Sequence, residues 1–152
     1  MNPTLRIRIL CVDDHPLFRE GIATVVANAD DLELVGTAGT AESALEQFRK
    51  HRPDITLMDL RLPDMNGISA IASIRAEFPE ARVIVVTTFE GDYEIQRALT
   101  AGAFGYLLKS APLDELVGVI RKVHVKRIMD KLGAKDRTQA VAIGIRRGVI
   151  SL

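Results

Sequence analysis

Five short apolar segments, separated by stretches with helical spacing, constrain the fold of this chain more than any other feature. The apolar segments are 6–12, 32–38, 55–59, 82–87 and 106–108. Between and after them, apolar residues recur three and four positions apart, which is the period of a helix with one buried face. The alternation predicts an α/β domain of five strands and five helices.

The apolar segments are nearly continuous, so both faces of each strand are expected to be covered by helices. Such burial indicates a parallel sheet. We therefore predict a flavodoxin-like, doubly wound, five-stranded parallel sheet. Pro16 and Thr40 are expected at helix starts, and Gly102 at a helix end. Ligands of such folds bind beyond the carboxyl ends of the strands.

Polar side chains follow four of the five predicted strands. They are Asp13 and Asp14, Asp59, Thr87 and Lys109. Three converging carboxylates repel one another unless a cation joins them, and a site of hard oxygen ligands suits Mg²⁺. An aspartate can attack phosphorus to form an acyl phosphate, while an ammonium and a hydroxyl hold the remaining phosphate oxygens.

Helix-start chemistry offers a second interpretation of the residues after the first strand. One of Asp13 and Asp14 is expected to cap the helix that follows, as well as to bind metal. His15 is interpreted as a helix-start residue and not as a ligand, because histidine is no preferred ligand of Mg²⁺.

The five separated positions and their order resemble the acidic pair, phosphoacceptor, hydroxyl and lysine of the response regulator receiver family. The segment 59–67 is similar to the loop after the family's third strand, and 105–110 is similar to the NarL/LuxR-type branch. The resemblance covers roughly residues 5–123. It implies a receiver domain in residues 1–123 that takes a phosphoryl group from a sensor histidine kinase in a two-component phosphorelay.

The resemblance also implies a role for each matching residue. Asp59 is the phosphoacceptor; Asp14 and Asp59 bind Mg²⁺ directly, Asp13 acts through water, and the backbone carbonyl of Arg61 is the third protein ligand. Thr87 and Lys109 contact the phosphoryl group, while Thr87 and Tyr106 form the conformational switch. No enzymatic turnover is expected beyond Mg²⁺-dependent self-phosphorylation and autodephosphorylation.

The C-terminal part of the chain differs from the rest in charge. Residues 1–120 hold 11 Lys and Arg against 18 Asp and Glu, whereas 121–152 hold 9 against 2. The asymmetry favours a nucleic-acid-related origin over a basic solvated tail. Residues 124–152 resemble the last half of a LuxR-type helix-turn-helix domain, whose recognition helix lies in the major groove. The resemblance makes Lys126, Arg127 and Lys131 the candidates for DNA contact.

This C-terminal segment departs from the family at Val123 and His124, where a linker and two scaffold helices are absent. The break indicates an internal deletion, natural or engineered. The apolar positions of 113–132 are compatible with one long amphipathic helix. Three outputs stay open: residual DNA binding, a homodimer gated by phosphorylation, or an inert remnant on a working receiver.

Two other classes of protein compete with the receiver. A phosphatase of the haloacid-dehalogenase type also uses Asp, Mg²⁺ and Lys, but its nucleophile ends the first strand and its second Asp comes two residues later, whereas Asp13 and Asp14 are adjacent. A flavodoxin-like cofactor binder needs a loop after the first strand that cradles a phosphate, and Asp13 and Asp14 there would repel a phosphate without metal. No apolar run approaches membrane-spanning length, and the lone Cys11 fits a reducing cytoplasm.

Overall fold

The computed structural model describes residues 6–88 and 91–132, and these form one sheet with helices on both faces. The strands are β1 (Ile7–Val12), β2 (Leu32–Ala38), β3 (Ile55–Met58), β4 (Val83–Thr87) and β5 (Gly105–Leu108). The helices are α1 (Pro16–Ala27), α2 (Ala41–His51), α3 (Gly67–Glu77), α4 (Asp92–Ala101) and α5 (Leu113–Leu132). Strands and helices alternate as the sequence predicts.

The sheet order is β2-β1-β3-β4-β5, and all four neighbouring pairs are parallel. This order reverses between β1 and β3, which is the switch point where ligands of doubly wound folds bind. The predicted flavodoxin-like fold is confirmed. We call the edge where the strands end the carboxyl end of the sheet, and the opposite edge the amino end.

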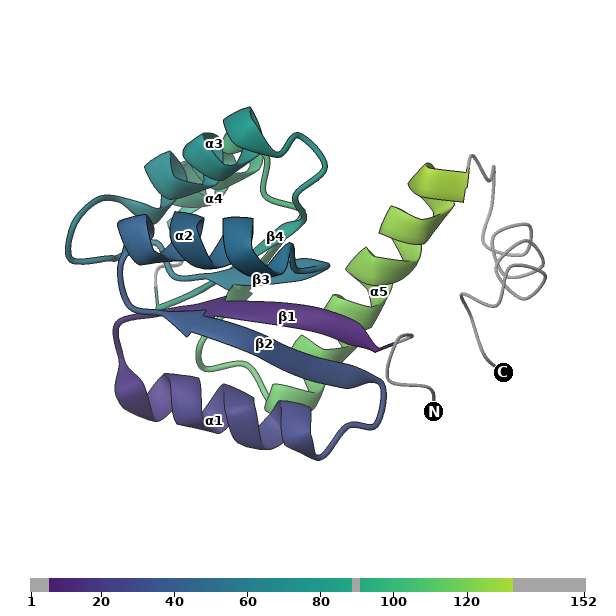
Figure 1. The fold of residues 1–152 in the computed structure, drawn as a ribbon. Coiled ribbons are helices and arrows are strands. Elements are labelled where there is room, and N and C mark those ends of the chain that lie inside the picture. Colours follow the sequence, from purple (N-terminus) through teal and green to yellow (C-terminus); the bar gives the residue numbers. More distant parts are fainter. Residues whose placement is uncertain (1–5, 89–90, 133–152) are drawn as a thin grey trace.

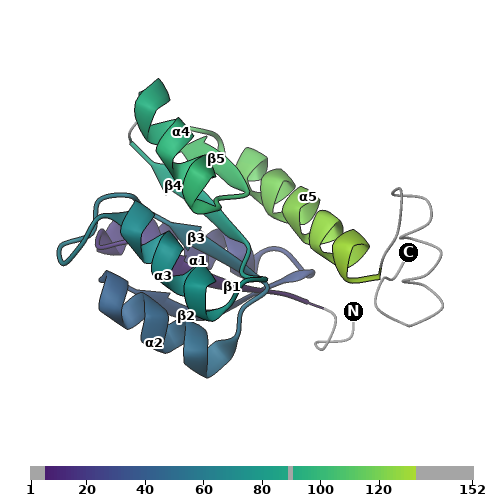
Figure 2. The same ribbon diagram turned by 90° about the horizontal axis from the view of Figure 1, so that it is seen from above.

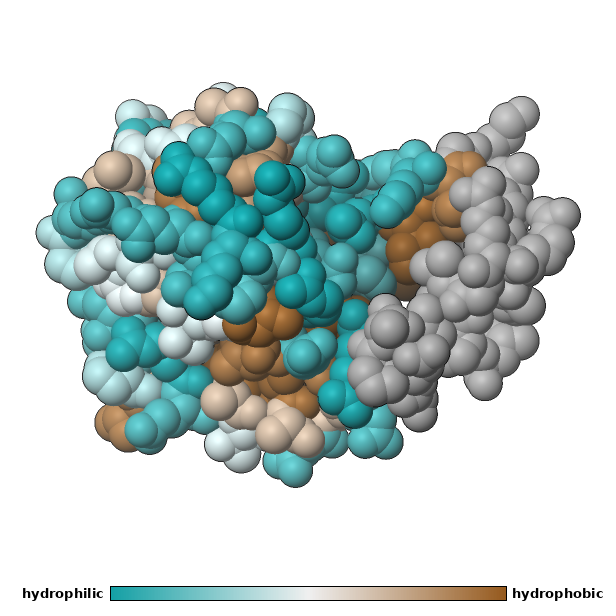
Figure 3. All heavy atoms as spheres, viewed as in Figure 1, coloured by the Kyte–Doolittle hydropathy of each residue, from teal (hydrophilic) through white to brown (hydrophobic). Residues whose placement is uncertain are grey.

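The side chains of the strands form two apolar cores, one on each face of the sheet. Helices α2, α3 and α4 cover one face and α1 and α5 cover the other (Figure 1; Figure 2). As an edge strand, β2 leaves an apolar patch on the surface where it adjoins α1 (Figure 3). No helix among the described ranges is long and apolar enough to cross a membrane.

Local capping residues fix where the helices begin and end. Pro16 occupies the first turn of α1, and Thr40 is the N-cap of α2, where its hydroxyl accepts a hydrogen bond from the N–H of Ser43 at 3.0 Å. Gly102 ends α4 with a φ of 114°, a conformation that favours glycine. All three predictions are confirmed.

Asp64 adds a cap that the local sequence did not reveal. Its carboxylate comes from the loop after β3 and accepts hydrogen bonds from the N–H groups of Ala41 and Glu42 in the first turn of α2, at 2.8 and 3.0 Å. These two hydrogen bonds lower the pKa of Asp64. The loop that follows Asp59 is thereby tied to the start of α2.

Helix α5 is the longest element, with 20 residues against 10 to 12 for the other helices. It starts at the carboxyl end of the sheet and runs back past the amino end (Figure 1). The backbone is helical through Val123 and His124, so the proposed boundary between the two segments lies inside one continuous helix. The rest of the C-terminal segment, from residue 133, lies outside the described residues.

Candidate functional site

Asp59 directly follows β3 and is buried, with 3% of its surface exposed. Its N–H donates to the carbonyl of Val12, so the backbone continues in register with β1. Gly67 packs directly on this segment: a Cβ at that position would overlap the carbonyl oxygen of Asp59. The glycine therefore allows α3 to start against the backbone that carries the carboxylate.

The acidic pair after β1 divides into a buried and an exposed carboxylate. Asp13 is 1% exposed, and its Oδ1 accepts a hydrogen bond from the N–H of His15 at 2.8 Å, whereas the side chain of Asp14 is 39% exposed. The N-cap of α1 is His15, without a side-chain cap. The expectation that Asp13 or Asp14 caps α1 was wrong: His15 is the residue before Pro16, and the Asp13 carboxylate points inward, where it accepts from the N–H of His15.

Lys109 directly follows the edge strand β5, and its side chain contacts the residues that follow β1 and β3. Its Nζ lies 2.7 Å from Oδ2 of Asp13 and 3.0 Å from Oδ2 of Asp59, and it sits 4.7 Å from the centre of the Phe18 ring. Burial lowers the pKa of Lys109, but the hydrogen bonds to the two carboxylates outweigh it, so the pKa is raised. Lys109 is therefore held charged between two acidic groups.

Thr87 and Tyr106 lie on the neighbouring strands. Thr87 ends β4 and is fully buried. Tyr106 lies in β5 opposite Val85 and packs against the core beneath α2, α3 and α4. Burial, Glu94 and Asp59 together raise the pKa of Tyr106, so its hydroxyl carries a proton at neutral pH. The role of both residues as a switch stays a prediction.

Asp13, Asp14, His15 and Asp59 form the cluster that can hold a metal ion. One ligand atom of each lies within 4.8 Å of the others. Three carboxylates in one hollow are hard oxygen donors, which fits Mg²⁺. The N–H of Arg61 reaches Oδ1 of Asp59 at 3.3 Å, which keeps the backbone of Arg61 beside the site. Its carbonyl as a third protein ligand stays a prediction.

His15, interpreted from the sequence as a helix-start residue and not as a ligand, also contacts the carboxylates of the site. Its Nδ1 lies 2.9 Å from Oδ1 of Asp13, 3.2 Å from Oδ1 of Asp14 and 3.9 Å from Oδ2 of Asp59. The available signal was its position directly after the acidic pair and before Pro16, since a residue before proline is extended. The structure confirms the helix-start interpretation of His15 and adds contacts with the carboxylates.

The three candidates for DNA contact lie far from this site, on the last turns of α5. Lys126 and Lys131 are exposed. Arg127 instead pairs with Asp54, just before β3, at 3.1 Å. We call residues 124–132 of α5 the α5 extension. Arg127 ties it to the amino end of the sheet, and Ile128 in it is 7% exposed but belongs to neither of the two apolar cores.

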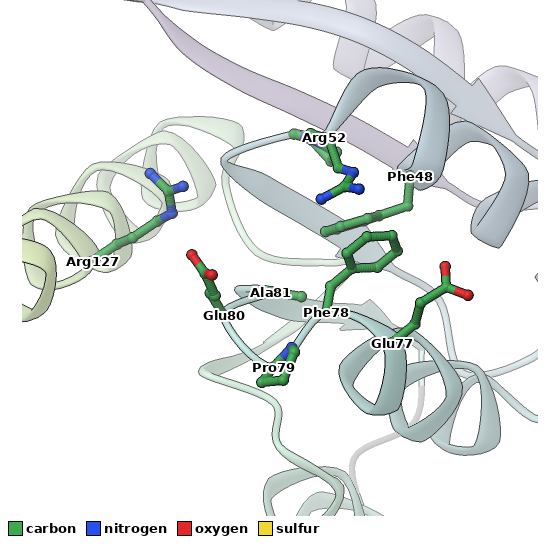
Figure 4. A pocket seen from close by; sticks show the side chains of 9 residues that line it. Phe48, Arg52, Glu77, Phe78, Pro79, Glu80, Ala81 and Arg127 are labelled. Atoms are coloured by element: carbon green, nitrogen blue, oxygen red, sulfur yellow. The ribbon is translucent and has the colours of Figure 1, made fainter.

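A second ion pair and a cavity mark where the α5 extension meets the sheet. Asp130 pairs with Arg82 at 2.8 Å, and the guanidinium of Arg82 stacks on Phe104. Beside this contact lies a cavity of about 280 Å³ (Figure 4). It is lined by Phe48, Arg52, Pro53, Glu77, Phe78, Pro79, Glu80, Ala81 and Arg127. None of the residues of the acidic site lines this cavity, so it is separate from that site.

Comparisons with known proteins agree with the geometry. The family model described as "Response regulator receiver domain" matches residues 9–121. The transcriptional regulatory protein MctR of Rhizobium johnstonii is 39% identical over 123 residues, which cover 81% of this chain and 58% of that protein. The response regulator GacA of Pseudomonas viridiflava is 42% identical over 117 residues, which cover 77% and 55%.

A solved structure supports the same assignment. The crystal structure of a two-component response regulator of the LuxR family from Aurantimonas sp. SI85-9A1 has a TM-score of 0.77 at 37% identity, covering 80% of this chain and 87% of that one. The chain spans a little over half the length of the curated relatives it matches.

Proposed function

Because this chain belongs to the response regulator receiver domain family, we propose that Asp59 accepts a phosphoryl group from the phosphohistidine of a sensor histidine kinase. The observation that carries the proposal is the double contact of Lys109, whose ammonium reaches both Asp13 and Asp59. A buried nucleophilic carboxylate beside a fixed cation and a second carboxylate is suited to bind a transferring phosphoryl group together with a metal ion.

In the transfer, an oxygen of the Asp59 carboxylate attacks phosphorus, the phosphorus–nitrogen bond breaks, and the imidazole of the kinase leaves and takes up a proton. Asp13, Asp14, Asp59 and the Arg61 carbonyl would hold Mg²⁺, which offsets charge on the phosphoryl oxygens. Lys109 exchanges its contact with Asp59 for a phosphoryl oxygen, and the Thr87 hydroxyl donates to another. Movement of Thr87 toward that oxygen leaves room for the ring of Tyr106 to turn inward.

The test is phosphorylation of the purified protein by acetyl phosphate and Mg²⁺, followed by intact mass measurement. The wild type should gain one phosphoryl group and Asp59→Asn none, because an amide is not nucleophilic at phosphorus. Asp64→Asn is the matched control: it changes an acid of the same loop, and its amide oxygen can still cap α2. A phosphoryl group retained in Asp59→Asn would contradict the assignment of Asp59.

Only a single transfer is proposed, with slow loss of phosphate by autodephosphorylation. Asp13 and Asp14 are adjacent, whereas a phosphatase of the haloacid-dehalogenase type has its second Asp two residues after the nucleophile, which does not favour multiple turnover of a free phosphoester. Release of phosphate from p-nitrophenyl phosphate at many equivalents per chain would contradict this and would support a phosphatase. The kinase as phosphodonor implies the cytoplasm as the compartment.

For the output we propose control of transcription, as the name of its relative, the transcriptional regulatory protein MctR, suggests. Lys126 and Lys131 are exposed and can reach DNA phosphates, whereas Arg127 must first leave Asp54. The test is fluorescence anisotropy of a labelled duplex, with and without Mg²⁺ and beryllofluoride, at low and physiological salt. Binding that persists at physiological salt and increases with beryllofluoride supports the proposal.

Binding to DNA only at low salt, indifferent to beryllofluoride, would contradict control of transcription by this chain. The output would then lie in protein contacts, and sedimentation of the same samples would show whether a homodimer forms with beryllofluoride.

A further inference from the structure

His15 brings a nitrogen atom into a site otherwise made of oxygen ligands. Its Nδ1 lies within 4 Å of a carboxylate oxygen from each of Asp13, Asp14 and Asp59. The side chain is 61% exposed, so the ring lies at the mouth of the site, above carboxylates of which two are buried. A ring in this place can reach an ion bound between the carboxylates without any movement of the sheet.

The backbone determines this placement of the ring. His15 is the N-cap of α1, with extended angles of −92° and 108°, and Pro16 restricts it to that region. Its N–H donates to Oδ1 of Asp13, the same oxygen that Nδ1 approaches. The ring is thereby attached to a fixed turn, and only its own side-chain torsions set the distance from Nδ1 to the carboxylates.

The distances from Nδ1 to the carboxylate oxygens are those of ligands that share one ion. In an octahedral site with bonds of about 2.1 Å, ligand atoms lie about 3.0 to 4.2 Å apart. Nδ1 lies 2.9, 3.2 and 3.9 Å from the oxygens of Asp13, Asp14 and Asp59, and all four candidate ligand atoms lie within 4.8 Å of one another.

Nδ1 of His15 faces both an ammonium and a carboxylate. It lies 3.1 Å from Nζ of Lys109 and 2.9 Å from Oδ1 of Asp13, so the tautomer of the ring decides whether Nδ1 accepts from the first or donates to the second. In the tautomer that carries its proton on Nε2, the Nδ1 lone pair is available to a metal ion between the carboxylates. Asp13, Asp14 and Asp59 supply negative charge around it.

We infer that His15 is a direct nitrogen ligand that makes this site take divalent ions of the first transition row more tightly than an all-oxygen site would. Imidazole binds Mn²⁺, Co²⁺, Ni²⁺ and Zn²⁺ but adds little for Mg²⁺, and affinity of mixed sites increases from Mn²⁺ toward Ni²⁺. The inference rests on the proposed phosphoryl-acceptor site and specifies which ions that site selects.

The test is calorimetric titration of Mg²⁺, Mn²⁺ and Ni²⁺ into the full chain without a polyhistidine tag, at one neutral pH. His15→Ala and His15→Asn are compared with the wild type, and His51→Asn, at the far end of α2, is the matched control for loss of a histidine. We expect both His15 variants to weaken Ni²⁺ by at least tenfold and Mn²⁺ by less, while Mg²⁺ changes by less than about twofold. His51→Asn should bind all three ions as the wild type does.

A direct readout is the nitrogen coupling in the pulsed electron paramagnetic resonance of bound Mn²⁺. The wild type and His51→Asn should show a coupled imidazole nitrogen, and His15→Ala should not. The inference is overturned if His15→Ala binds every ion as tightly as the wild type, or more tightly. Binding of Mg²⁺ by that variant would still show that the acidic site is intact. The proposed function fails by a different result: a protein that binds the ions but takes no phosphoryl group.

Discussion

The two ends of the sheet use charge in opposite ways. At the carboxyl end, three carboxylates share one hollow with the Lys109 ammonium, and two of them are buried. At the amino end, the α5 extension forms opposite-charge pairs, Arg127 with Asp54 and Asp130 with Arg82. At the carboxyl end the carboxylates outnumber the ammonium, so negative charge is left over for a metal ion. At the amino end each charge has one partner of opposite sign, which suits packing of the helix on the sheet.

The largest effect is expected at the carboxyl end, from Lys109→Ala. Loss of the ammonium removes the cation that stabilises the transferring phosphoryl group, so the rate of phosphorylation of Asp59 should fall on the order of 100-fold. The rate is measured by intact mass against time with acetyl phosphate. Lys126→Ala, an exposed lysine of the α5 extension, is the control and should phosphorylate at the wild-type rate. Equal rates in the two variants would show that Lys109 does not stabilise the transferring phosphoryl group.

The next effect is expected at the amino end, from Ile128→Ala. The side chain is buried, so its truncation should lower the free energy of unfolding by about 2 kcal/mol, the lower bound for buried isoleucine. Urea denaturation followed by circular dichroism measures it, again with Lys126→Ala as reference. Phosphorylation of the folded Ile128→Ala protein should be unchanged. A loss below about 0.5 kcal/mol would show that burial of Ile128 does not stabilise the fold.

A smaller effect is expected for the ion pair between Arg127 and Asp54. Both side chains are partly buried, so a double-mutant cycle with alanine should give a coupling of about 0.5–1 kcal/mol, weaker in high salt. Asp54 also accepts the N–H of Arg8 at 2.9 Å, so Asp54→Ala alone should cost more than Arg127→Ala alone. Additive single effects would show that the pair adds no cohesion.

The smallest effect is expected from pH. Burial lowers the pKa of His124 below its ordinary 6.5, and Arg127 adds to this against the opposing effect of Asp54 and Asp31. The unfolded chain therefore takes the proton more readily, and folding stability should decrease as the pH falls below about 6.5. Urea midpoints at pH 5.5 and 7.5 measure it. His124→Gln should reduce the difference between the two midpoints, and an unchanged difference would exclude His124 as its source.

The sequence predicted most of the carboxyl end and little of the amino end. Asp13, Asp59 and Lys109 each directly follow a strand, and in a parallel sheet strand ends share one edge, so a one-dimensional pattern was enough to bring them together. The contacts of the His15 ring with the carboxylates were not predicted, because they depend on side-chain torsions that no spacing encodes. Asp64 was missed because its partners in α2 are 22 and 23 residues away.

The destination of the α5 extension could not be predicted for a related reason. The apolar stripe with Ile128 indicated a helix with one buried face but not the surface that buries it. Only the three-dimensional arrangement shows that α5, antiparallel to the strands, carries Arg127 back to the start of β3. Charge spacing gave no sign of the Asp54 partner, 73 residues earlier in the sequence.

Because α5 is one continuous helix, the number of residues in its first half determines the direction in which each side chain of the α5 extension points. Each residue advances the helix by about 100°, so Leu116 and Ile120, buried in the core, fix the direction in which Ile128 points. One alanine inserted at the junction of Val123 and His124 would rotate Ile128 by about 100° away from its buried position. Four would return its direction to within about 40° but move it about 6 Å along the helix axis. Any insertion at the junction therefore separates Arg127 and Asp130 from Asp54 and Arg82, so the number of residues in α5 decides whether the α5 extension meets the sheet.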